Sequence, residues 1–96
     1  MYENLLHQVV LVRSINAGVY YGTLEEVKDS TVRLSKLRNI YKWEGASCLA
    51  QIANDGIRGG QVSQVVSEAI LTDVCQIFPL TEIAQISLDK APVWKL

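Results

Sequence analysis

Apolar and polar positions alternate along most of the first half of the chain, a pattern typical of β-strands. Residues 9–15 form an almost continuous apolar run, which indicates a mostly buried strand. Gly18 and Asp29 then stand where turns are expected, between runs of alternating residues. Gly22, inside the second run, indicates a bulge or a sharp bend. The pattern therefore predicts a β-meander over residues 9–43.

The pattern changes to a helical spacing after Gly45. Apolar residues recur every three or four positions over residues 46–56, so we expect a short helix there. Ser47 is its predicted N-cap and Gly56 its end. The following residues, 57–67, contain paired glycines and little that can pack, which predicts a mobile loop.

The last third of the chain is predicted to hold one more strand and one more helix. Residues 68–79 are rich in β-branched and apolar side chains and end at a proline, so they are expected to form a single strand. Thr81 is the predicted N-cap of a helix over residues 81–90. Residues 91–96 form a tail in which Trp94 and Leu96 either fold back onto the core or dock on a neighbouring subunit.

These elements predict one domain, residues 1–96, because a chain of 96 residues supports one core and not two. The expected fold class is α+β, mainly antiparallel β. We expect the meander to curl into a small SH3/Sm-like barrel, with one or two short helices.

Composition narrows the choice of compartment and partners. Nine Lys and Arg against ten Asp and Glu give a net charge of -1, which argues against binding to extended nucleic acid. No apolar run reaches the length of a transmembrane helix and the start lacks a signal-peptide pattern, so we expect a cytoplasmic protein without a membrane partner. Cys48 and Cys75, each beside apolar residues, are expected to be free, buried thiols.

The sequence shows no constellation for catalysis or metal binding. His7 is the only histidine, and two isolated cysteines have no recognised ligand spacing. Glu25 and Glu26 are adjacent on a predicted strand, so they are expected to point to opposite faces. We therefore expect no enzyme activity, no catalytic residue, no metal and no cofactor.

One stretch combines cationic, amide and aromatic side chains within six residues, just before a predicted helix. Aromatic rings can stack on a base, and cationic side chains can hold phosphate oxygens. The predicted ligand-binding residues are Arg38, Tyr41, Lys42 and Trp43, together with Arg58 from the glycine-rich loop. The alternative is that Tyr41 and Trp43 share a face with Leu37 and belong to the core, which leaves the cations solvated.

Several segments resemble a family of small proteins of unknown activity encoded by tailed phages and prophages. The resemblance spans residues 9–86, and its most specific part is the step from Trp43 to Ala46 into the predicted helix. It implies a viral origin. A second resemblance, to the Sm-like barrel, rests on Gly18, on Gly22 to Leu24, and on Asp29; it ends after Asp29 and implies only the curled meander.

These observations favour a binding protein over an enzyme. The leading hypothesis is a homo-oligomer that captures a nucleotide-like small molecule, such as a host immune signal. One alternative is a protein-interaction module that acts through a sheet edge or the tail. Local RNA binding is a second alternative.

Overall fold

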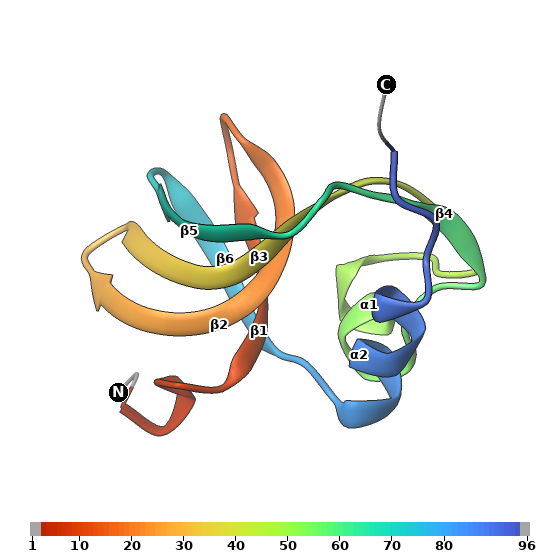
Figure 1. Ribbon diagram of the computed structural model, residues 1–96. Helices are drawn as coiled ribbons and strands as arrows, with labels where there is room; N and C mark the ends of the chain where they lie inside the picture. Colours follow the sequence, from red (N-terminus) through yellow and green to blue (C-terminus); the bar gives the residue numbers. More distant parts are fainter. Residues whose placement is uncertain (1–2, 95–96) are drawn as a thin grey trace.

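The computed structural model describes residues 3–94 and contains six strands and two α-helices (Figure 1). A short 3-10 helix, η1 (Glu3–Leu5), precedes the first strand. The elements that follow are β1 (Val9–Ser14), β2 (Gly18–Lys28), β3 (Thr31–Glu44), α1 (Leu49–Asp55), β4 (Gly59–Val62), β5 (Val66–Leu71), β6 (Val74–Pro79) and α2 (Glu82–Asp89).

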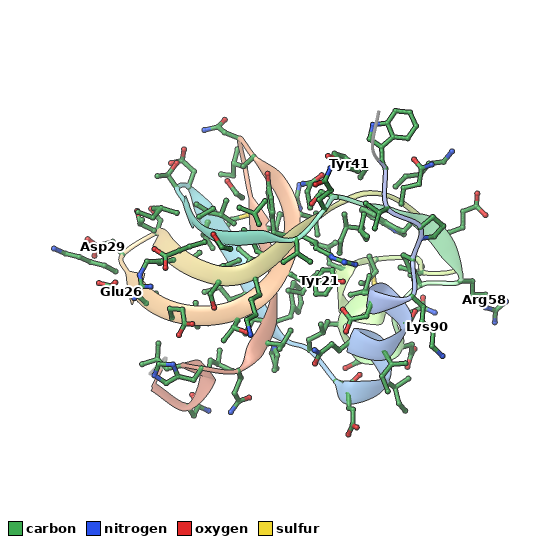
Figure 2. The ribbon with its side chains drawn as sticks, in the orientation of Figure 1. Tyr21, Glu26, Asp29, Tyr41, Arg58 and Lys90 are labelled. Atoms are coloured by element: carbon green, nitrogen blue, oxygen red, sulfur yellow. The ribbon has the colours of Figure 1, made fainter. Side chains whose placement is uncertain are left out.

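The predicted meander over residues 9–43 is confirmed by β1, β2 and β3, which pair in antiparallel succession. Its turns use the residues that the sequence indicated, since Gly18 and Asp29 both have positive φ, 101° and 54°. Asp29 lies at the tip of the β2–β3 hairpin, at the end of the molecule away from the helices (Figure 2). The β2–β3 register shifts at Gly22, where a side chain would collide with the backbone of Leu37. Gly22 is therefore the predicted bulge.

The six strands form one antiparallel sheet that stays open. The strand order is β4-β3-β2-β1-β6, and β5 pairs with the first half of β3. Within residues 3–94, β6 pairs only with β1 and β5 only with β3, so no ladder closes the sheet. The fold is thus the expected α+β, mainly antiparallel class, but these strands do not form the predicted SH3/Sm-like barrel.

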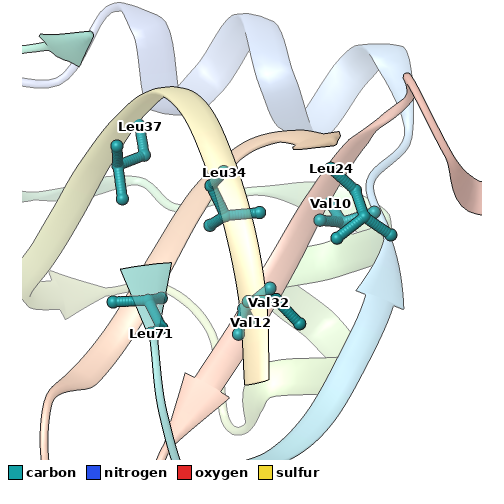
Figure 3. Packing of buried hydrophobic residues seen from close by; sticks show 7 residues of the cluster. All are labelled: Val10, Val12, Leu24, Val32, Leu34, Leu37 and Leu71. Carbon is teal, nitrogen blue, oxygen red and sulfur yellow. The ribbon is translucent and has the colours of Figure 1, made fainter. Parts of the chain in front are cut away.

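One apolar cluster packs among the strands themselves (Figure 3). Its buried side chains come from β1, β2, β3 and β5: Val10, Val12, Leu24, Val32, Leu34, Leu37 and Leu71. Leu5 and Leu6, near η1, pack against it. This cluster uses the even-numbered residues of β1, so it occupies one face of that strand.

A second apolar cluster lies on the opposite face of β1, under the helices. Leu11 and Tyr21 from the sheet meet Ile52 and Ala53 of α1 and Leu88 of α2. Because residues 10 to 12 are all fully buried, β1 is covered on both faces. This confirms the buried strand that its continuous apolar run predicted.

Both predicted helices exist, and α2 has the predicted cap: the Thr81 side chain accepts a hydrogen bond from the Ala84 N–H at 3.1 Å. In α1 the predicted cap is wrong, because Cys48 is the N-cap residue and Ser47 instead donates to the Gln51 side chain at 2.9 Å. Gly56 ends α1 as predicted, with φ 84°. A side chain there would collide with Ser87, so this glycine also lets the end of α1 approach α2.

The segment predicted as a mobile loop, residues 57–67, contains strand β4 and the start of β5 instead. β4 pairs with the second half of β3. The tail folds back on β4, since Val93 bridges Val62 and the Trp94 N–H donates to the Val62 carbonyl at 2.9 Å. Leu96 lies outside the described residues.

The single strand predicted over residues 68–79 is two strands, β5 and β6, separated by Thr72 and Asp73. Asp73 has a positive φ of 54°, which reverses the chain without a glycine or a proline. The turn is fastened to the end of β1, where Ser14 donates to the Thr72 carbonyl at 2.6 Å. None of the described helices is long and apolar enough to cross a membrane.

Candidate functional site

A pocket lies on the face of the sheet that the helices cover, beyond the area that they cover and beside the start of α1. Across the sheet, Arg13 of β1 lies between Val19 of β2 and Gln76 of β6 in the strand registers. The neighbouring row, which contains Leu11 and Phe78, packs in the second core cluster. Arg13, Val19 and Gln76 therefore lie on the same face of the sheet as this cluster, but none of the described helices covers them. They form the floor of the pocket.

The walls of this pocket come from β3 and from the start of α1. Trp43 comes from β3, and residues 48–50 come from the start of α1. The pocket has a volume of about 630 Å³, which falls within the range of small-molecule sites. We call it the sheet-face pocket; it is lined by Arg13, Val19, Trp43, Cys48, Leu49, Ala50, Gln76 and Phe78.

The position of Trp43 depends on the strand opposite it. Trp43 pairs with Gly60 of β4, whose φ is 145°. A side chain on Gly60 would collide with the Lys42 carbonyl and with the Trp43 backbone. Gly60 therefore allows β4 to run close beside β3 and holds the Trp43 backbone at the pocket wall.

Arg13 is the one formally charged residue among the eight that line the pocket. It is exposed, and within residues 3–94 its guanidinium has no ion-pair or hydrogen-bond partner in the protein. A guanidinium donates several hydrogen bonds in a plane and suits carboxylate or phosphate oxygens. The floor of the pocket thus offers an uncommitted anion-binding group beside two aromatic side chains, Trp43 and Phe78.

Cys48 brings a thiol to the rim of the pocket. Hydrogen bonding to the backbone N–H of Gln51, and then to the Ser47 hydroxyl, lowers the pKa of the Cys48 thiol. The Gln51 N–H stabilises the thiolate by donating to the sulfur, whereas the Ser47 hydroxyl, 3.7 Å from the sulfur, shares its single proton between Cys48 and the Gln51 side chain. Cys48 and Cys75 are free, as predicted, but both are exposed rather than buried. Cys48 lines the pocket and Cys75 lies on the other face of β6, next to Ile77 and Val27.

The structure does not gather the five predicted ligand-binding residues in one place. Trp43 lines the sheet-face pocket. Arg38 lines a second pocket of about 340 Å³ with Lys36 and Asp89, and Arg58 lines a third, of about 240 Å³, with Lys90. In Figure 2, Arg58 and Tyr41 lie well apart.

The remaining predicted residues have other surroundings. Tyr41 and Lys42 are exposed, and 53% of the Tyr41 surface is accessible. Trp43 is half-buried and packs against the second core cluster, so one of the two aromatic residues of this stretch belongs partly to the core. The stem of Arg58 covers Gly45, leaving no room there for a side chain.

The predicted alternation along residues 36–43 fails because β3 is irregular. Lys36 has a positive φ of 49°, and the register with β4 shifts between Ile40 and Lys42. As a result Leu34, Leu37 and Ile40 are buried at intervals of three, not two. Residues that alternation placed together therefore point into different surroundings.

Sequence reasoning missed Arg13, Val19, Gln76 and Phe78, which come from three strands. The available signal was Arg13 itself, a cation that interrupts the apolar run of a buried strand. Its partners could not be found without the strand register. His7, by contrast, is exposed, bonds to Glu25 at 3.0 Å and does not line this pocket.

The fold and the pocket define a small α+β protein with an open antiparallel sheet and one partly uncovered sheet face. Comparison with family models matches residues 7–88 to a domain of unknown function, DUF6948, and the chain belongs to this family. No curated protein and no solved structure matches the chain significantly.

Proposed function

We propose that the protein captures a nucleotide-like small molecule in the sheet-face pocket, without chemical conversion. The observation that carries this proposal is an Arg13 guanidinium that has no partner among residues 3–94 and lines a pocket together with Trp43 and Phe78. The aromatic residues would receive a planar base, and the guanidinium would bind an anionic group. Of the residues singled out in the sequence, Trp43 keeps its proposed role and Arg13 takes the role given to Arg38, Lys42 and Arg58.

The contacts available are sufficient for weak to moderate affinity. A base stacked on an aromatic side chain contributes about 1–3 kcal/mol, and a hydrogen bond to a charged group about 1.5–3 kcal/mol. Together they correspond to dissociation constants between about 15 mM and about 40 μM. Contact with Val19 and Leu49, which also line the pocket, would add to this.

A binder of this kind acts by lowering the free concentration of its ligand. The resemblance to phage-encoded proteins extends this proposal to an infected bacterial cell. There, the captured molecule would be a nucleotide signal of the host. Sequestration requires only that the protein be abundant relative to the ligand and bind it at its working concentration.

Calorimetric titration with a panel of linear and cyclic nucleotides tests the proposal, using the wild type, Arg13→Ala and Arg38→Ala. We expect heat with at least one member of the panel, a loss of at least about tenfold in affinity for Arg13→Ala, and little change for Arg38→Ala. Arg38 is the matched control because it is a cation that lines a different pocket. An absence of heat with every nucleotide contradicts the proposal, and a loss confined to Arg38→Ala places the site in the second pocket.

A second candidate role, self-association, is favoured by the free edge of β5. Within the described residues β5 pairs on one side only, and its Val66 and Ile70 side chains are 47% and 65% exposed. An unprotected apolar edge strand tends to pair with another strand, and two-fold pairing with a second copy satisfies both edges. An antiparallel register centred on Ala69 places Glu68 opposite Ile70 of the other copy, and so keeps the two Glu68 carboxylates from facing each other.

The mass in solution tests this second role. We expect the wild type to run as a dimer and Ile70→Lys to run as a monomer, because an edge lysine opposes strand pairing. Ile83→Lys, on the exposed side of α2 and 71% accessible, is the control and should leave the mass unchanged. A monomeric wild type rules this role out.

A further inference from the structure

We infer that the ligand of the sheet-face pocket carries a single negative charge beside its planar ring, as a nucleoside cyclic phosphodiester does, and is not a polyphosphate. This inference rests on the proposed function and specifies the class of molecule that the same site accepts. It is carried by the distribution of charge around the pocket, which the strand register fixes.

Arg13 is flanked by neutral residues on both sides of its row. Val19 is its register neighbour on β2 and Gln76 its neighbour on β6. An anion bound to the guanidinium therefore has an apolar contact on one side and an amide on the other. The amide NH₂ of Gln76 can donate hydrogen bonds to phosphate oxygens but supplies no second charge.

The other cationic side chains that could bind a second phosphate line different pockets. Arg38 and Lys36 line the second pocket, and Arg58 lies beside Gly45 with Lys90 nearby. In the sheet-face pocket itself, Arg13 alone of the lining residues carries a charge. Each further phosphate would thus lose part of its hydration without gaining a cationic partner, which is unfavourable.

A ligand with one anionic group needs only the guanidinium that the pocket supplies. Its ring remains free to contact Trp43 and Phe78, which line the same pocket as Arg13.

Fluorescence titration of Trp43 measures the charge preference directly. Trp94 is 51% exposed at the end of the described chain, so Trp94→Phe removes the only other tryptophan and leaves Trp43 as the sole reporter. The probes are adenosine, 3′,5′-cyclic AMP and ATP, which share a base and differ in charge. They are compared at one ionic strength, because screening changes the apparent preference.

We expect cyclic AMP to bind about tenfold more tightly than adenosine, and ATP to bind no more tightly than cyclic AMP. In the Arg13→Ala variant the advantage of cyclic AMP over adenosine should disappear, while far-ultraviolet circular dichroism remains that of the wild type because Arg13 is exposed. If ATP binds at least about tenfold more tightly than cyclic AMP, this inference is wrong and the proposed function stands. If none of the three changes the fluorescence, this inference is wrong, and the calorimetric panel decides separately whether the proposed function stands.

Discussion

The phenolic hydroxyl of Tyr21 donates a hydrogen bond to Asp89 Oδ1 at 2.9 Å. Tyr21 lies in β2 and is only 4% exposed, whereas Asp89 is the last residue of α2. This bond therefore joins the sheet to the C-terminal end of the helix that covers it. It holds α2 against the part of the sheet that this helix covers, beside the uncovered part that forms the sheet-face pocket.

Removal of this hydrogen bond should destabilise the protein measurably. Tyr21→Phe keeps the buried ring but leaves Asp89 without its donor, so we expect the free energy of unfolding in urea to fall by about 1–2 kcal/mol. Tyr41→Phe is the matched control, because Tyr41 is half exposed and forms no hydrogen bond with the described residues. Equal stability of the two variants would show that the Tyr21–Asp89 bond contributes nothing.

The same bond predicts how stability responds to alkali. Burial, followed by the hydrogen bond to Asp89 and the charge of Asp89, raises the pKa of Tyr21 from 10.0 to about 12. Because the folded-state pKa is above the unfolded value, the contribution of Tyr21 is fully present below pH 10 and is lost as the pH rises towards 12. The wild type should lose stability over this range more steeply than Tyr21→Phe, as thermal unfolding at a series of pH values measures. Parallel curves for the two proteins would contradict this.

Gly60 and Gly59 are adjacent glycines in β4 that should respond very differently to substitution. A Cβ on Gly60 would collide with the Lys42 backbone at a φ of 145°, whereas a Cβ on Gly59 meets its nearest atom, the Glu44 carboxylate, at 3.5 Å. We expect Gly60→Ala to cost about 1–3 kcal/mol of unfolding free energy and Gly59→Ala to cost much less. In a Trp94→Phe background, Gly60→Ala should also shift the emission maximum of Trp43, because it displaces the β3 backbone beside that ring. If both substitutions have the same small effect, the close β3–β4 contact does not form.

The parts of the fold that the sequence predicted correctly depend on local signals. The meander follows from alternating strands and from Gly18 and Asp29, whose positive φ angles close the turns. The C-terminal end of α1 follows from Gly56, and the start of α2 follows from Thr81, which caps it.

The parts that could not be predicted depend on contacts distant in the sequence. The turn at Asp73 lies within an apolar stretch without glycine or proline and is held by Ser14, 58 or more residues away from it along the chain. β4 becomes a strand only because the second half of β3 is available to pair with it. The open sheet likewise follows from which strands pair, and no local pattern determines that.

The candidate site was predicted only in part for a related reason. Trp43 was identified because it stands in an aromatic and basic stretch, but Arg38 and Arg58 of the same prediction line other pockets. The pocket is assembled from register neighbours on β1, β2 and β6, and a register cannot be derived from one strand alone. Arg13 and Gln76 are separated by more than half of the chain and yet lie side by side.

The two exposed cysteines provide a chemical test of where a ligand binds. Cys48 lines the sheet-face pocket, and Cys75 lies on the other face of β6. A saturating concentration of cyclic AMP should slow the alkylation of Cys48 by iodoacetamide and leave the rate at Cys75 unchanged, as peptide mass mapping would show. Protection of both thiols would indicate a general change in the protein, and protection of Cys75 alone would place the ligand elsewhere.

The most direct test of the central claim is residue-level mapping of the binding site by nuclear magnetic resonance. Titration of the isotope-labelled protein with cyclic AMP should shift the backbone amide signals of Arg13, Val19, Trp43 and Leu49, together with the indole N–H of Trp43. The signals of Lys36, Arg38 and Arg58 should stay in place. Shifts confined to those three cationic residues, or no shifts at all, would contradict the assignment of the sheet-face pocket as the binding site.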